Sequence, residues 1–170
     1  MEQAISSNSK VLLRVSQFLL ILSLIVVAPL IGNQFITGIT VNALLLGSVI
    51  LFGFSGALSL CFIPSSISLF TGLLPWVMAP MVPFIIVGNI LLVLVFELFR
   101  KKNFFLGLIP GALLKFSFLF FVSNYLINFF IQQSVASKIA VMMSWPQLIT
   151  ALAGGFIVYF SQDFLKKNNK

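Results

Sequence analysis

The chain has 170 residues, of which 60% are hydrophobic and only 8% are charged. A soluble domain carries about 25% charged residues, and it could not cover this much apolar surface, so a water-exposed globular fold is excluded. The net charge of +7 does not indicate a nucleic-acid partner, because the charges stand at the ends of apolar runs, where they orient a membrane protein.

Long apolar runs without alternating polar residues predict helices rather than the strands of a membrane barrel. Each membrane span needs about 20 apolar residues. We therefore predict an all-α, polytopic bundle that forms a single membrane domain. Its six transmembrane helices are expected at about residues 11–31, 35–51, 57–74, 83–99, 104–131 and 144–164.

The first half of the chain contains several turn signals. The first run follows Lys10 and Arg14, as in a signal peptide, but residues 26–29 lack a small-residue cleavage pattern, so we expect a retained helix. A polar turn follows at residues 32–34, and Gly53 begins a tight turn before the third helix. Pro64 predicts a kink within that third helix.

The start of the sixth helix has two interpretations. Ser144 is suited to cap a helix, and a proline at position 146 is tolerated in a first turn. Residues 135–143 then form either a short interfacial helix or the upper arm of a kinked sixth helix.

Charge tests the number of spans. Six spans place eight basic residues on one side and only Lys138 on the other. This bias predicts that both termini are cytoplasmic, whereas five spans would separate residues 100–102 from the C-terminal lysines. The residues on the inner side are Lys10, Arg14, Arg100, Lys101, Lys102, Lys166, Lys167 and Lys170.

The sequence offers little for catalysis. It has no histidine, and its one cysteine, Cys61, excludes an internal disulfide and a cysteine-based metal cluster. Glu97 and Asp163 each precede basic residues by about one turn, so we expect local ion pairs at the inner interface. We therefore expect no enzyme activity, no metal and no cofactor.

Polar side chains at membrane depth are costly in lipid and tend to face the bundle interior or a cavity. The amides of this chain gather in the outer halves of the helices, which suggests a ligand pocket open to the outside. The alternative is hydrogen bonding between amides of neighbouring helices, worth roughly 0.6–2 kcal/mol for each pair. The candidate binding residues are Asn42, Trp76, Asn89, Lys115, Asn124 and Gln147, and the candidate gating-loop residues are Asn33, Gln34 and Trp145.

Lys115 also has two interpretations. If its helix begins at Phe104, Lys115 lies about 16 Å along the helix, near the middle of the membrane. A bare ammonium there costs at least ~2.5 kcal/mol and would need an anion, such as a substrate carboxylate. If the helix begins at Pro110, Lys115 lies near the inner surface and extends its charge to water.

Two segments carry a family resemblance. Residues 38–75 read GITVNALLLGSVILFGFSGALSLCFIPSSISLFTGLLP, and residues 83–89 read PFIIVGN. With the six-helix plan and the basic tail, they resemble the substrate-binding S component of energy-coupling-factor (ECF) transporters. The resemblance implies a vitamin or metal-related substrate in a pocket open to the outside, gated by the 1–2, 3–4 and 5–6 loops. It also implies a cell-membrane complex with a transmembrane T component and two ATPase subunits.

Residues 142–155, MMSWPQLITALAGG, are similar to a small subgroup of these proteins that can carry an iron-hydrogenase label. An iron–sulfur centre needs several cysteine ligands, and this chain has one. The first helix lacks the AxxxA-type motif with which family members often dock the T component. Three other functions stay open: a structural or assembly membrane protein without a small-molecule pocket, a membrane-bound enzyme or redox accessory protein, and a channel.

Overall fold

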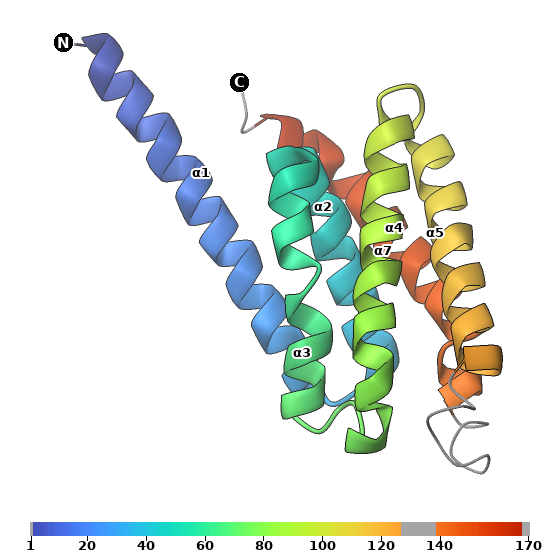
Figure 1. Ribbon diagram of the computed structural model, residues 1–170. Coiled ribbons are helices and arrows are strands. Elements are labelled where there is room, and N and C mark those ends of the chain that lie inside the picture. Colours follow the sequence, from blue (N-terminus) through green and yellow to red (C-terminus); the bar gives the residue numbers. More distant parts are fainter. Residues whose placement is uncertain (1, 127–138, 168–170) are drawn as a thin grey trace.

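The protein is a bundle of membrane-length helices (Figure 1). The computed structural model describes the backbone of residues 2–126 and 139–167 and the side chains of residues 9–125 and 139–162. In this part of the chain the α-helices are α1 (Glu2–Val27), α2 (Gln34–Leu60), α3 (Ile63–Phe70), α4 (Val82–Arg100), α5 (Phe104–Phe121) and α7 (Trp145–Lys167). Shorter helical segments are η1 (Ala28–Ile31), η2 (Trp76–Met81) and η3 (Val122–Leu126).

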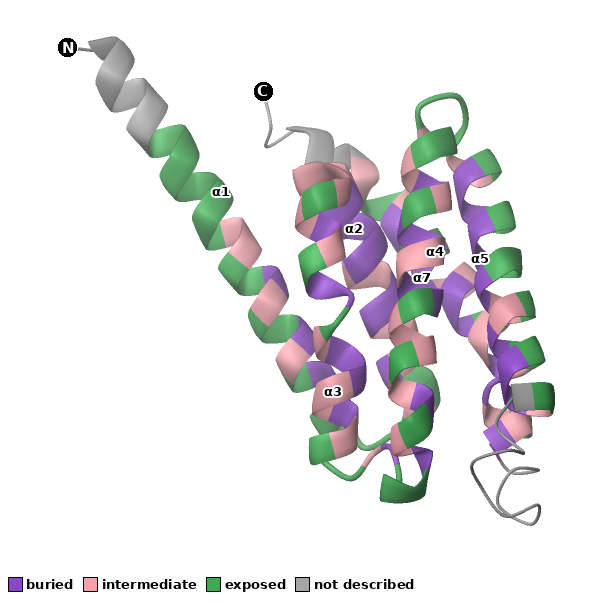
Figure 2. Ribbon diagram, in the orientation of Figure 1, coloured by how far each residue is buried: buried purple, intermediate pink, exposed green. Residues whose placement is uncertain are grey.

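The prediction of an all-α polytopic membrane bundle is confirmed. Five segments are long and apolar enough to cross a membrane: Ser9–Ile31, Gln34–Leu60, Trp76–Arg100, Phe104–Tyr125 and Ile139–Gln162. Figure 2 shows buried residues on the inner faces of α2, α4, α5 and α7, whereas most of α1 is exposed. Large apolar side chains on the outer faces are suited to contact with lipid.

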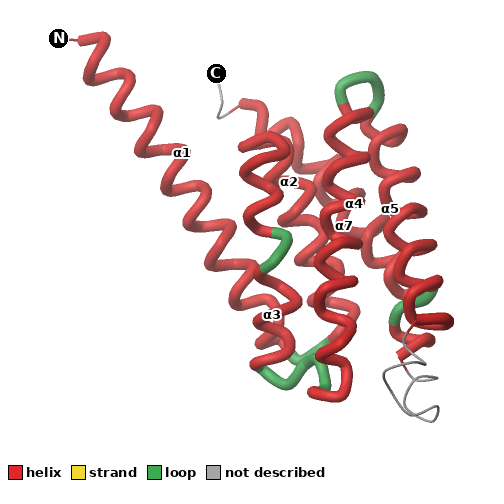
Figure 3. The backbone as a smooth tube through the Cα atoms, viewed as in Figure 1, coloured by secondary structure: helices red, strands yellow, loops and turns green. Residues whose placement is uncertain are grey.

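The chain reverses direction inside α2. Gly53 has φ 72° and ψ −171°, a conformation that residues with a Cβ rarely adopt, and it joins two helical pieces. Residues 34–52 lead to one end of the bundle, and residues 54–60 with α3 return from it (Figures 1 and 3). The tight turn predicted at Gly53 is therefore confirmed. The start of α1 and the end of α7 lie at the same end of the bundle (Figure 1).

The third helix, predicted over residues 57–74 with a kink at Pro64, consists of two helical pieces. The return crossing is broken at Cys61 and Phe62, and a new helix, α3, begins at Ile63. Pro64 stands in the first turn of α3. Proline has no backbone N–H and is tolerated best in a first turn, so the disruption predicted at Pro64 takes the form of a break just before it.

Asparagine caps fix where two of the other helices begin. The Asn33 side chain accepts hydrogen bonds from two backbone N–H groups in the first turn of α2, at 3.0 and 3.1 Å. Asn103 accepts two in the first turn of α5, at 2.8 and 3.4 Å. The fifth helix therefore begins at Phe104, and Pro110 lies within it. Residues 127–131, expected to end this helix, lie outside the described residues.

The sixth predicted span begins before Ser144. Residues 139–142 are helical and lead through a turn at Met143 and Ser144 into α7. Because Ile139–Gln162 forms one membrane-length segment, the structure favours the upper arm of a kinked helix over a separate interfacial helix. Residues 135–138, including Lys138, lie outside the described part of the chain.

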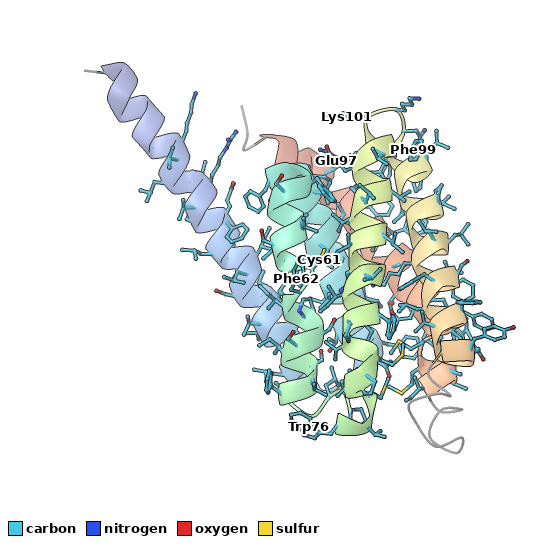
Figure 4. All side chains as sticks on the ribbon, in the orientation of Figure 1. Cys61, Phe62, Trp76, Glu97, Phe99 and Lys101 are labelled. Atoms are coloured by element: carbon cyan, nitrogen blue, oxygen red, sulfur yellow. The ribbon has the colours of Figure 1, made fainter. Side chains whose placement is uncertain are left out.

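The two ends of the bundle differ in charge. Glu97 accepts a hydrogen bond from Arg100 Nε at 2.6 Å and lies 4.0 Å from Lys101 Nζ, which confirms the expected local ion pair. Figure 4 shows Glu97 and Lys101 at one end and Trp76 at the other. The side chains of Asp163 and of the C-terminal lysines lie outside the described residues.

Candidate functional site

Lys115 lies in the middle of α5 and is buried between helices, with 3% of its surface exposed. Its Nζ donates hydrogen bonds to Asn42 Oδ1 at 2.7 Å and to Asn89 Oδ1 at 2.8 Å. Because α5 begins at Phe104, Lys115 lies about 16 Å along the helix. The interpretation in which the helix begins at Pro110 and Lys115 reaches the inner surface is therefore wrong.

A second partner orients each of these two amides. Asn42 Nδ2 donates to Thr150 Oγ1 at 3.3 Å, and Asn89 Nδ2 donates to the backbone oxygen of Cys61 at 3.4 Å. With the amide nitrogen held in this way, the amide oxygen of each residue faces the ammonium of Lys115. The network connects α2, α4, α5 and α7 in the interior of the bundle.

A close approach between α7 and α2 makes the Asn42–Thr150 contact possible. A Cβ atom at Gly154 would lie 2.7 Å from the backbone nitrogen of Ala43 and 2.8 Å from the backbone oxygen of Ile39. Only glycine allows the two backbones to come this near. Thr150 is one turn earlier on the same face of α7, and it is thereby brought within reach of Asn42.

The break at Cys61 and Phe62 supplies the acceptor for Asn89. In a continuous helix the carbonyl of Cys61 would accept from a backbone N–H four residues later. The helix ends at Leu60, and the free carbonyl accepts from a side chain of α4 instead. The Cys61 thiol is fully buried and contacts Ala57 O at 3.4 Å, which agrees with a packing role for this side chain.

A cavity of about 90 Å³ lies beside this network. It extends from Lys115 toward the start of α2 and the turn after α3, at the end of the bundle opposite the described termini. A volume of this size holds several water molecules or a small ligand. The cavity is lined by Gln34, Thr37, Gly38, Val41, Asn42, Pro64, Ser65, Ser68, Leu73, Leu74, Ile85, Asn89, Lys115, Met143 and Gln147.

The cavity carries one charge. Lys115 is the only ionisable residue in the described part of its lining, and both side-chain acceptors of its Nζ there are neutral amides. An ammonium buried without a counter-charge is unfavourable, because its hydration is lost and no opposite charge replaces it. The site is therefore electrostatically suited to a negatively charged or strongly polar group.

Ser65 adds an unused hydrogen-bonding group to the same wall. It lies on α3, just after the break, with 4% of its surface exposed. Its hydroxyl has no hydrogen-bond partner among the described residues. Buried hydroxyls are nearly always hydrogen-bonded, so this one is available to a group inside the cavity.

The structure brings together most of the predicted binding residues. Asn42, Asn89, Lys115 and Gln147 all line the cavity, as does Gln34 from the predicted gating loops. These residues come from four different helices and from distant parts of the sequence. The predicted clustering of polar side chains toward one end of the bundle is thus observed in this part of the chain.

The remaining candidates lie outside the cavity. Trp76 is 66% exposed and packs on Phe70, with the ring centres 6.2 Å apart. Asn124 donates to the backbone oxygen of Phe120 at 2.8 Å, in the helix on which it lies. The other two are Trp145, which packs on Phe35 at 6.2 Å, and Asn33, which caps α2. The prediction that Trp76 and Asn124 line this pocket is therefore not met.

Three small hydroxyl residues were missed by sequence reasoning. Thr150 orients Asn42, and Ser65 and Ser68 form part of the cavity wall. Serine and threonine are common in membrane helices, because their hydroxyls bond to the preceding turn of the same helix, as that of Ser68 does. Residue type alone therefore gave no signal, although the spacing of Gln147, Thr150 and Gly154 places them on one face of α7.

No protein-family model, curated protein or solved structure matches this chain. The functional argument therefore comes from the cavity and from the residues around it. Within the described residues, no group of three histidine, cysteine or acidic side chains is placed to hold a metal ion.

Proposed function

We propose that this chain is the substrate-binding subunit of an ECF-type uptake transporter for a small, vitamin-like molecule. The observation that carries the proposal is the cavity beside Lys115, which is lined by polar side chains in an otherwise apolar bundle. Ligand pockets in bundles lie between helices in this way, with a few polar groups that fix the orientation of the ligand. The resemblance of residues 38–89 and 142–155 to S components supports the same function.

The charge distribution supports the direction of transport. Lys10, Arg14 and residues 100–102 precede or join spans at the end of the bundle opposite the cavity mouth. The positive-inside rule assigns that end to the cytoplasm. Both termini would then be cytoplasmic, and the cavity would face the outside of the cell membrane, as uptake of a solute requires.

Transport needs partners in this proposal. The sequence has no nucleotide-binding motif, so the energy would come from ATPase subunits coupled through a transmembrane T component. The N-terminal part of α1 diverges from the other helices (Figure 1), and most of its large apolar side chains are exposed. This helix offers a surface for such a partner within the bilayer.

Ligand binding by the isolated protein tests the proposal. The full chain, purified into lipid nanodiscs without added ligand, is screened by thermal unfolding against vitamins and their precursors. We expect one compound to raise the unfolding temperature of the native protein and of Lys102→Met, and to have a much smaller effect on Lys115→Met. Lys102 is an exposed lysine at the other end of the bundle. If no compound in a broad panel stabilises the protein, the proposal fails.

A structural or assembly role is the second candidate. One observation favours it: Asn42 and Asn89 are joined through Lys115 into a continuous network, as expected for polar groups that hold helices together. In this role no ligand would change the unfolding temperature. Substitution of Lys115 would then lower the amount of folded protein and leave solute uptake by cells unchanged.

A further inference from the structure

We propose that the ligand of this cavity carries a single carboxylate on a short apolar body. The carboxylate accepts hydrogen bonds from Lys115 Nζ and from the Ser65 hydroxyl. This inference rests on the proposed function, because it assigns a chemical class to the substrate of the same site. It is carried by two buried donor groups, the third N–H of the Lys115 ammonium and the Ser65 hydroxyl, for which the described residues supply no acceptor.

The first donor is the ammonium of Lys115. An ammonium has three N–H groups, and amide oxygens of Asn42 and Asn89 accept two of them. The structure describes no third acceptor, and Lys115 lines the cavity. The amides stabilise the ammonium without neutralising it, so the site retains a full positive charge in a medium of low polarity.

The second donor is the hydroxyl of Ser65. It is buried on α3, lines the same cavity and has no partner among the described residues. Lys115 belongs to α5, so the two donors come from different helices whose side chains meet in one cavity. A carboxylate has two oxygens and accepts from two separate donors, which fits this pair.

The remaining wall determines the charge and body of the ligand. Lys115 is the only ionisable residue among the described residues of the lining, so a monoanion neutralises this charge and a dianion leaves excess negative charge. A cation is repelled, and a neutral molecule leaves Lys115 without a counter-charge. Six of the other lining side chains are apolar, and they suit a short hydrocarbon body: Val41, Pro64, Leu73, Leu74, Ile85 and Met143.

Three probes of the same size test the charge requirement. Butyrate, butyramide and butylamine are titrated into the full chain in nanodiscs made of zwitterionic lipid, and binding is followed by thermal unfolding. Millimolar affinity is within reach of ligands this small. We expect butyrate to raise the unfolding temperature, butyramide to bind at least about tenfold more weakly, and butylamine to have no effect. No shift with butyrate, or equal shifts with butyrate and butyramide, would overturn the inference.

Two substitutions test the geometry. Asn42→Asp places a carboxylate of the same shape beside Lys115. This carboxylate supplies the counter-charge of the ammonium in place of the ligand, so it should abolish binding of butyrate. The unfolding temperature of the ligand-free variant should be equal to or above that of the native protein, which shows that the fold is intact. If Asn42→Asp does not fold, Asn89→Asp replaces it in the same test. Ser65→Ala should weaken butyrate binding by about fivefold.

The matched control is Asn33→Asp. It makes the same chemical change at the cap of α2, where aspartate is as good as asparagine, and it should leave butyrate affinity unchanged. Undiminished binding of butyrate to Asn42→Asp would overturn the inference. If a neutral vitamin binds while butyrate does not, the proposed uptake function stands and the carboxylate is wrong. If neither binds, the proposed function itself fails.

Discussion

Lys115 and Asn42 are 73 residues apart in the sequence, and their Nζ and Oδ1 atoms lie 2.7 Å apart inside the bundle. Asn89 accepts from the same ammonium at 2.8 Å, so one cation joins α2, α4 and α5. Among the described residues that line the adjoining cavity, none carries a carboxylate. Substitutions at this junction are therefore expected to change both ligand binding and helix packing.

Lys115→Met removes the charge and keeps a side chain of similar length. We expect the affinity for an anionic ligand to fall more than tenfold, because its counter-charge is lost. The free energy of unfolding should change by less than about 2 kcal/mol, since removing a buried charge offsets the loss of two hydrogen bonds. Thermal unfolding with and without ligand measures both quantities. Unchanged affinity would remove Lys115 from the site, and Lys102→Met is the control.

Thr150→Val keeps the shape of the side chain and removes the acceptor of Asn42 Nδ2. We expect a loss of about 1–2 kcal/mol in the free energy of unfolding, because a buried amide N–H is left without its partner. Ligand affinity should also fall, since the oxygen of Asn42 is less firmly held toward Lys115. Chemical denaturation in detergent measures the first effect. Thr71→Val, at an exposed position, should show neither effect, and equal losses in both variants would contradict this role of Thr150.

Gly154→Ala should separate α7 from α2. The new Cβ would lie 2.7 Å from the backbone nitrogen of Ala43, closer than packed atoms approach, so the helices must move apart. We expect a loss of about 1–3 kcal/mol of stability together with weaker ligand binding. Gly47→Ala on α2 is the matched control, because a Cβ there meets no atom within 4 Å. If both variants unfold at the same temperature, close packing at Gly154 is not important.

The orientation in the membrane can be measured with single cysteines. In a Cys61→Ala background, Trp76→Cys should react with a membrane-impermeant maleimide added to intact cells, because η2 lies at the end of the bundle expected outside. Lys101→Cys lies at the opposite end and should react only after the membrane is permeabilised. The reverse pattern would mean that the cavity faces the cytoplasm, and it would exclude uptake from the outside.

Much of the fold could be predicted from apolar run length and turn signals. The reversal at Gly53 and the capped turns at Asn33 and Asn103 lie where the sequence places polar or glycine residues between apolar runs. The break at Cys61 and Phe62 was missed because it lies inside an apolar run, where no polar residue marks it. The one signal is Pro64, which predicts a kink, and the interruption lies just before it at the start of α3.

The site was predictable in part for a physical reason. Amides and a lysine are rare and costly at membrane depth, so Asn42, Asn89 and Lys115 stood out and do meet in one cavity. Trp76 was expected in the pocket but lies at the end of the bundle, in an exposed position typical of tryptophan at a membrane interface. The packing of the helices decides which of their faces meet, as it does for α2 and α7 at Gly154. This packing cannot be read from one sequence.

The helix break at Cys61 and Phe62 has a consequence for the order in which the protein assembles. Bare peptide groups at membrane depth are tolerated only where protein covers them, and Asn89, 28 residues later in the chain, bonds to the carbonyl of Cys61. We therefore expect the carbonyl of Cys61 to lack this partner while the third crossing leaves the translocon. It reaches its final form only after α4 has been synthesised and inserted beside it.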